Sequence, residues 1–267
     1  MAGGKKRDPL KRGTPANRTL LSQTLLSVVY LALLGGLFTF LLADRRVWLL
    51  ALGALFPSER ELLYPRADLP ALFGEHLILV VVSSAAAAIV GTALGIFVTR
   101  PAGRDFRPVV SDLSSFAQTI PPVAVLALAV PFIGFGLKPA LLALFLFSVL
   151  PVLRNTVAGL ESVPAHLLEA AEGMGMTRGQ ALRRVELPLA FRVIMAGIRT
   201  SVVINVGTAT VGAIAGAGGF GSPIVAGLVR ENPAFVLEGA VSAALLAFFL
   251  DQLLARVERG GLRRGAG

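Results

Sequence analysis

Residues that could carry out covalent chemistry are few in this 267-residue chain. It has no cysteine, and two lone histidines, His76 and His166, do not make a zinc cluster. A phosphate-binding loop needs Gly-x-x-x-x-Gly-Lys-Ser/Thr, and no lysine of the chain stands in that pattern. Neither a Gly-x-Ser-x-Gly elbow nor a carboxylate pair on a soluble domain is present. We therefore expect no catalytic residue, no metal site and no bound cofactor in this chain.

Polar residues gather instead in one internal segment, EAAEGMGMTRGQALRRVELP, at residues 169–188. Just before it, Pro164 suits the first turn of a short helix. Gly173 or Gly175 can end that helix in a left-handed conformation, which glycine adopts at little cost. The first half of the segment is therefore predicted to be a short helix that a glycine turn closes.

The second half of the segment carries a helix-start signal. Thr177 and Gln180 have the spacing of a capping box, and Pro188 is expected to end the helix near Leu187. The two helices would present the apolar side chains of four residues beside charged side chains; the four are Leu167, Leu168, Leu182 and Val185. Two interpretations remain open on physical grounds: a loop packed on the protein's own surface, or a docking surface for another subunit.

The elements on either side of this segment are strongly apolar. Hydrophobic residues make up 55% of the chain and charged residues 15%, against about a quarter charged in soluble domains. A membrane-spanning helix needs roughly 17 to 25 apolar residues. Six segments approach or meet this length and predict an all-α, polytopic membrane protein: residues 21–42, 77–98, 114–137, 139–153, 193–215 and 235–254.

Basic residues near the ends of the spans orient the set. Residues 1–20 are rich in Lys and Arg, and residues 255–267 and the segments 99–113 and 154–192 are rich in Arg. Because basic loops are retained on the cytoplasmic side, both termini and these segments are predicted to be cytoplasmic. Topology thus accounts for the net charge of +9, and we expect no nucleic-acid partner.

The polar segment resembles the EAA loop found in permease subunits of binding-protein-dependent ABC importers. The motif is filled by Glu169, Ala170, Ala171, Gly175, Val185, Leu187 and Pro188, with Thr177 inside the same loop. Val185 stands where the family usually has isoleucine. In that family the loop forms the coupling helices that sit in a groove of the ATPase subunit.

Further motifs are similar to the osmoprotectant branch of that family, which takes up glycine betaine, choline, carnitine and related quaternary ammonium compounds. They include QTIPP at 118–122, GFGLKPA at 134–140, LPVLRNT at 150–156, GMGMT at 173–177, NVGTAT at 205–210 and GAGGFG at 216–221. The resemblance covers about residues 75–254. It implies a type I importer (MetI-like) permease core in the cytoplasmic membrane of a bacterium or archaeon.

The same resemblance implies the partners. These are ABC ATPase subunits that bind ATP and Mg²⁺, an extracytoplasmic substrate-binding protein, and a second permease that is either another copy or a paralogue. An importer of another small solute, amino acid-like or ergothioneine-like, is an alternative. An ion-driven secondary transporter and a membrane scaffold are less favoured, because neither inverted repeats nor mid-membrane carboxylates are evident.

Two regions are candidates for the translocation path. Glycines are dense after residue 206, and there they either allow close helix packing or interrupt a helix whose backbone lines the path. The 118–122 turn leaves the same two alternatives open. The candidate path residues are Gln118, Thr119, Pro121, Asn205, Gly207, Thr208, Thr210, Gly216, Gly218 and Gly219.

Three ionisable residues fall within the predicted spans. Arg199 and Asp251 lie at matched depth toward the cytoplasmic side, and we hypothesise that they pair. Glu238, near the outer end of the last span, is expected to be solvated.

The chain therefore divides into a basic tail at 1–20, an extra span with an external segment at 21–74, a permease core at 75–254 containing the coupling loop 154–192, and a basic tail at 255–267.

Overall fold

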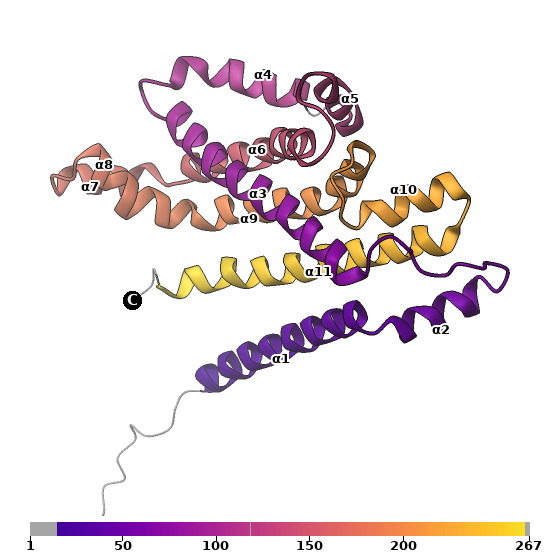
Figure 1. Cartoon of the computed structure of the whole chain (residues 1–267). Coiled ribbons are helices and arrows are strands. Elements are labelled where there is room, and N and C mark those ends of the chain that lie inside the picture. Colours follow the sequence, from indigo (N-terminus) through magenta and orange to yellow (C-terminus); the bar gives the residue numbers. More distant parts are fainter. Residues whose placement is uncertain (1–14, 118, 265–267) are drawn as a thin grey trace, which may run out of the picture.

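The computed structural model describes residues 15–117 and 119–264, and every regular element within them is helical (Figure 1). The long helices are α1 (Pro15–Ala43), α3 (Leu69–Thr99), α6 (Leu137–Glu161), α9 (Leu187–Gly212) and α11 (Pro233–Arg264). The shorter helices are α2 (Arg45–Leu55), α4 (Arg107–Ala117), α5 (Pro122–Ile133), α7 (Ala165–Gly173), α8 (Arg178–Ala181) and α10 (Gly221–Arg230). Two 3-10 segments, η2 (Arg104–Phe106) and η4 (Ala213–Ala215), and a π-helical turn (Leu182–Glu186) complete the set. The predicted all-α class is confirmed.

Four stretches of the described chain are long and apolar enough to cross a bilayer: Leu69–Thr99, Leu137–Glu161, Arg178–Ala215 and Pro233–Arg259. A fifth span results if the helices Val28–Ala43 and Arg45–Leu55, between which the chain bends by 79°, cross the bilayer together. The predicted spans 77–98, 139–153, 193–215 and 235–254 each lie inside one of the four. The predicted count of six is therefore not confirmed.

The predicted span 114–137 is wrong as a single helix. Its residues are divided between α4 and α5, because consecutive prolines at 121 and 122 break the helix. Pro121 is extended, with φ −62° and ψ 140°, and Gly134 ends α5 at φ 79°. Twelve helical residues rise only about 18 Å, which is short of the roughly 30 Å hydrocarbon core.

At the centre of the bundle, α6 packs against both α3 and α9, which also contact each other. Glycine makes these approaches possible: a Cβ built on Gly95 of α3 would lie 2.6 Å from the Cβ of Thr156, and one on Gly197 of α9 would lie 2.5 Å from that of Asn155. Small residues at such contacts are typical of membrane helices. Helix α11 packs along α9 and α10, and α1 lies against α11.

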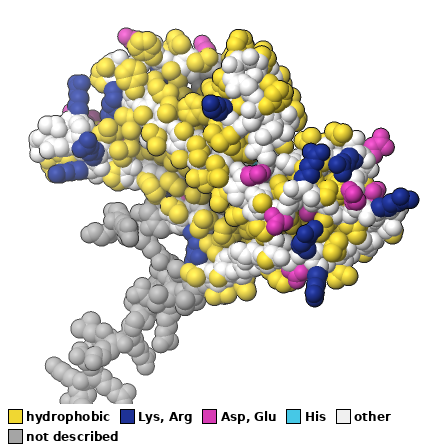
Figure 2. All heavy atoms as spheres, viewed as in Figure 1, with side chains coloured by type: hydrophobic (Ala, Val, Ile, Leu, Met, Phe, Trp, Pro, Cys, Tyr) yellow, Lys and Arg dark blue, Asp and Glu magenta, His cyan; other side chains and the backbone are white. Residues whose placement is uncertain are grey.

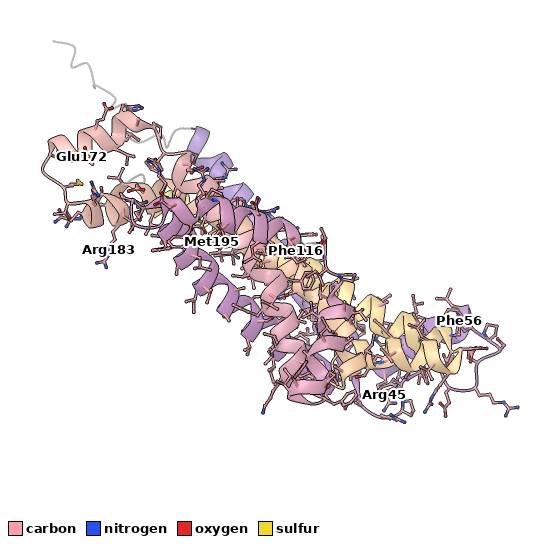
Figure 3. All side chains as sticks on the ribbon, turned by 90° about the horizontal axis from the view of Figure 1, so that it is seen from above. Arg45, Phe56, Phe116, Glu172, Arg183 and Met195 are labelled. Atoms are coloured by element: carbon pink, nitrogen blue, oxygen red, sulfur yellow. The ribbon has the colours of Figure 1, made fainter. Side chains whose placement is uncertain are left out.

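Hydrophobic side chains cover much of the face shown in Figure 2, and most charged side chains gather toward the two ends. Figure 3 places Glu172 and Arg183 at one end of the molecule and Arg45 and Phe56 at the other. The polar loop and helix α2 therefore lie at opposite ends of the bundle.

Residues 56–68 join α2 to α3 and are called the strap below. Its backbone is tied to the α10–α11 corner: the Asn232 amide donates to the Glu61 carbonyl at 2.8 Å, and the Tyr64 N–H donates to a Glu238 carboxylate oxygen at 2.8 Å. Glu238 is buried, with 3% of its surface exposed. The expectation that Glu238 is solvated is therefore wrong, because the strap covers it.

Candidate functional site: the polar loop and the glycine turn

The first half of the polar loop folds as predicted. Helix α7 follows Pro164, and its C-terminal end is closed by N–H groups of Gly175 and Met176, which donate to the carbonyls of Glu172 and Ala171 at 2.8 and 3.0 Å. Gly175 is left-handed at φ 75°, whereas Gly173 is the last helical residue. A Cβ on Gly175 would meet nothing within 4 Å. The requirement for glycine here is therefore set by the backbone angle and not by space.

The predicted capping box is also confirmed. The Thr177 N–H donates to Oε1 of Gln180 at 2.9 Å, and the Gln180 N–H donates to Oγ1 of Thr177 at 3.3 Å. These two bonds satisfy amides that have no partner within the helix. The second helix of the loop thus starts where the sequence places it.

The predicted end of that helix near Leu187 is wrong. Helix α8 continues through the π-helical turn into α9, and the Leu187 N–H donates to the Leu182 carbonyl, five residues back. A proline ring ordinarily clashes with the carbonyl four residues before it. We attribute the continuity to the wider π turn immediately before Pro188, which changes the register of the hydrogen bonds. The polar loop is therefore joined to a spanning helix without a break in the chain's helical path.

Within the loop, exposure separates surface residues from packing residues. Glu169, Ala170 and Pro188 are exposed, Ala171 is fully buried, and Val185 and Leu187 are half-buried. Leucines 167, 168 and 182 are half-buried as well, so they serve the loop's own packing more than an outer surface. Met174, which the sequence motifs do not mark as a contact residue, is a large apolar side chain with 70% of its surface exposed.

Two ion pairs anchor the loop, and neither was predicted from the sequence. Arg100, at the end of α3, makes a bidentate contact with Glu186 of the π turn; its Nη1 lies 2.9 Å from Oε1, and Nη2 contacts Oε2. Glu186 is buried, with 7% of its surface exposed. Arg107 donates to Glu161 at the end of α6 at 2.8 Å, on a more exposed surface. The only sequence signal was the abundance of Arg in 99–113.

A glycine turn at the other end of α9 interrupts the helix, in line with one of the two sequence alternatives. Helix α9 ends at Gly212, η4 follows, and α10 begins at Gly221. Gly216, Gly218 and Gly219 have φ of 78°, 82° and 73°. The turn packs on α3, because the Gly219 N–H donates to a Glu75 carboxylate oxygen at 2.7 Å.

Close packing adds a second reason for glycine in this turn. A Cβ on Gly218 would lie 2.2 Å from Oε2 of Glu75, and one on Gly219 would lie 2.8 Å from Nδ1 of His76. His76 is fully buried, with its Nε2 3.1 Å from the Val206 carbonyl. Backbone angle and space together restrict these positions to glycine.

The remaining path candidates are distributed over different environments. Asn205 is buried between α3 and α9, and its amide donates to the hydroxyls of Ser83 and Ser84 at 2.9 and 2.8 Å. Gly207 is exposed, Thr208 is half-buried, and the Thr210 hydroxyl donates to the Gly207 carbonyl at 2.7 Å. Exposed positions at Thr200, Ile204 and Gly207 share one face of α9.

The other path region lies at the break between α4 and α5. Thr119 is exposed, with its hydroxyl donating to the Phe116 carbonyl at 2.7 Å, and Pro121 caps α5. Gln118 lies outside the described residues. The break is therefore present, and its role in a path stays a prediction.

The hypothesis that Arg199 and Asp251 pair is confirmed. Their contact is bidentate, with Nε–Oδ1 at 2.5 Å and Nη2–Oδ2 at 2.7 Å. Glu258 lies about two helical turns further along α11 and approaches both Arg199 and Arg192 at 3.6 Å. The pair joins the N-terminal half of α9 to the C-terminal half of α11.

Comparison with known proteins supports the resemblance to importer permeases. Residues 91–261 match the family described as binding-protein-dependent transport system inner membrane component. The chain is 45% identical over 209 residues to the osmoprotectant import permease protein OsmY of Salmonella typhimurium, covering 78% of this chain and 86% of the relative. It is 41% identical to the glycine betaine/carnitine/choline transport system permease protein OpuCB of Bacillus subtilis, covering 70% of this chain and 85% of that one.

The fold is matched by a solved structure as well. An inward-facing MetNI methionine ABC transporter superimposes with a TM-score of 0.63 at 25% identity, covering 70% of this chain and 93% of the other. The loop, the long helices and these matches lead to one conclusion. The chain belongs to the family of binding-protein-dependent transport system inner membrane components.

Proposed function

We propose that this protein is the permease subunit of an ATP-driven importer that moves small osmoprotectants of the quaternary ammonium type, such as glycine betaine, choline and carnitine, into the cell. The observation that carries the substrate class is the 45% identity to an osmoprotectant import permease over 86% of its length. An importer of an amino acid-like or ergothioneine-like solute is the alternative.

ATP hydrolysis belongs to a partner in this proposal. ATPase subunits that carry ATP and Mg²⁺ dock on the polar loop, where Glu169, Ala170 and Met174 are exposed. Their motion passes into the membrane through α8, the π turn and α9, which run continuously from Arg178 to Ala215. Such coupling requires two global states that nucleotide binds unequally.

A second permease, either another copy or a paralogue, completes the path. This part of the proposal is supported by large apolar side chains that are exposed in the single subunit. Leu128 and Phe132 of α5 and Phe135, just after α5, are 68%, 88% and 78% exposed. The candidate residues on the neighbouring face of α9 and the 118–122 break would then face the partner across the path. Both termini lie in the cytoplasm, and a substrate-binding protein docks at the opposite end.

The test is purification of the tagged protein with its ATPase and binding protein, followed by uptake of labelled glycine betaine, choline and carnitine into proteoliposomes. We expect ATP-dependent accumulation of at least one of these compounds, and no uptake without the binding protein. Uptake of amino acids alone would reassign the substrate. Uptake that follows an ion gradient without ATP would overturn the proposal.

A further inference from the structure

A pocket of about 500 Å³ opens at the end of the bundle away from the polar loop. Its wall combines the strap, α3, the glycine turn and α10, through residues that include Tyr64, Arg66, Glu75, Gly218 and Arg230. This volume falls in the range of about 300–1,000 Å³ that is typical of small-molecule sites. Both Gly216 and Gly218, which the sequence marked as path candidates, line it.

The carboxylate of Glu75 is fixed in this wall without a cationic partner. One of its oxygens accepts the Gly219 N–H at 2.7 Å, and the glycine turn packs directly against it. Within the part of the chain that the structure describes, no ion pair joins Glu75 to a basic side chain. A positioned, unneutralised carboxylate in a pocket attracts a cation, and the attraction strengthens as water is displaced.

The strap side of the pocket carries the opposite charge and an aromatic ring. Arg66 is exposed and has no ion-pair partner among residues 15–117 and 119–264, while Arg230 is 3.4 Å from Glu61 in a solvent-exposed contact. Tyr64 is held in place by its N–H bond to Glu238 and by edge-on packing on Phe235, with ring centroids 6.1 Å apart. Aromatic rings attract quaternary ammonium groups through their π faces.

We propose that this pocket is an external substrate subsite, in which Glu75 and Tyr64 receive a quaternary ammonium head and Arg66 receives the carboxylate of a zwitterionic substrate. The inference rests on the proposed function and deepens it, because it assigns the two ends of the ligand to named side chains. A quaternary nitrogen has no N–H to donate, so charge and the aromatic ring must hold it. Choline, which lacks a carboxylate, would use only the Glu75 side.

The experiment compares Glu75→Gln and Arg66→Gln with Arg60→Gln, an exposed arginine of the same strap that does not line the pocket. Glutamine at 75 keeps an oxygen for the Gly219 N–H, so the turn is retained while the charge is lost. Binding of labelled choline and glycine betaine is measured on the purified permease–ATPase complex without the binding protein. Uptake into proteoliposomes is measured in parallel.

For Glu75→Gln we expect binding of both ligands to weaken about tenfold or more, which corresponds to about 1.4 kcal/mol. For Arg66→Gln we expect weaker binding of glycine betaine and unchanged binding of choline, and Arg60→Gln should match the wild type. Unchanged binding in both pocket variants, or an equal loss for the two ligands in Arg66→Gln, would overturn the subsite. If the wild type transports no quaternary ammonium compound, the proposed function itself fails, and this is seen before any variant is compared.

Discussion

Arg100 and Glu186 face each other in a partly buried, bidentate ion pair that ties the C-terminal end of α3 to the π turn between the polar loop and α9. The two residues are 86 positions apart in the sequence. Removing one partner of a buried pair leaves the other charge without compensation. This contact thus holds the junction of the loop and α9 against the end of α3.

Arg100→Ala should therefore lower stability by about 2 kcal/mol, because Glu186, 7% exposed, is left without its partner while the partly exposed site admits some water. Thermal unfolding in detergent, followed by loss of the monodisperse peak in size-exclusion chromatography, measures this. Arg107→Ala is the matched control, because its pair with Glu161 is exposed and should contribute about 1 kcal/mol or less. Equal losses in the two variants would contradict the assigned difference.

Gly175→Val should uncouple the loop while leaving the protein in the membrane. Valine at φ 75° is strained, so the turn after α7 must rearrange. We expect loss of the co-purifying ATPase and at least about a tenfold fall in ATP-driven uptake, since about 1.4 kcal/mol of lost docking energy suffices. Gly179→Val is the control, because Gly179 lies in helix α8 with nothing within 4 Å of a built Cβ. Normal uptake by Gly175→Val would refute the role of the loop.

Single replacements of Arg199 or Asp251 should reduce the amount of folded protein in the membrane, because each strands a charge among apolar helices. Asp251→Asn should be the milder change, since Glu258 lies 3.6 Å from Arg199 and remains as a partner. The double variant Arg199→Asp with Asp251→Arg should recover part of the loss. Unchanged expression of Asp251→Asn and of Arg199→Gln would show that the pair does not contribute to folding.

Glu238→Ala should release the strap from α11. The Tyr64 N–H would lose its acceptor, so the strap backbone around Arg60 and Arg66 should be cut faster by trypsin, by a factor of about five to ten for a bond of about 1–1.5 kcal/mol. Glu238→Gln keeps an acceptor oxygen and is the control. Mass spectrometry of the fragments locates the cuts. Equal cleavage in both variants would mean that the strap is held by other contacts.

Local signals were the part of the structure that the sequence predicted well. The left-handed Gly175 and the Thr177–Gln180 capping box each depend on a few neighbouring residues, and both are present. The end of the helix at Pro188 was wrong because a π turn, which has no simple sequence signature, carries the chain past it. The contact between Arg100 and Glu186 could not be predicted, since it depends on how α3 packs beside the loop.

Burial was the second source of error. Glu238 was expected to be solvated because it lies near the end of an apolar segment, but the strap 56–68 folds back and covers it.

The single span predicted at 114–137 was wrong for a different reason. The prediction used the average hydrophobicity of the segment, whereas Pro121 and Pro122 break the helix locally and divide it into two. The first error depends on how a neighbouring segment folds over the helix, and the second on a local proline break that an average over the segment does not register.

The continuous helical path from Arg178 to Ala215 has a mechanical consequence. At 1.5 Å per residue, its 38 residues form a rod of about 57 Å. Tilting such a rod by about 5° about its polar-loop end moves the far end by about 5 Å, close to the rise of one helical turn. The far end is where the glycine turn rests on Glu75. If the loop couples to an ATPase as proposed, we expect a slight tilt of this helix to shift the glycine-turn wall of the pocket by about 5 Å.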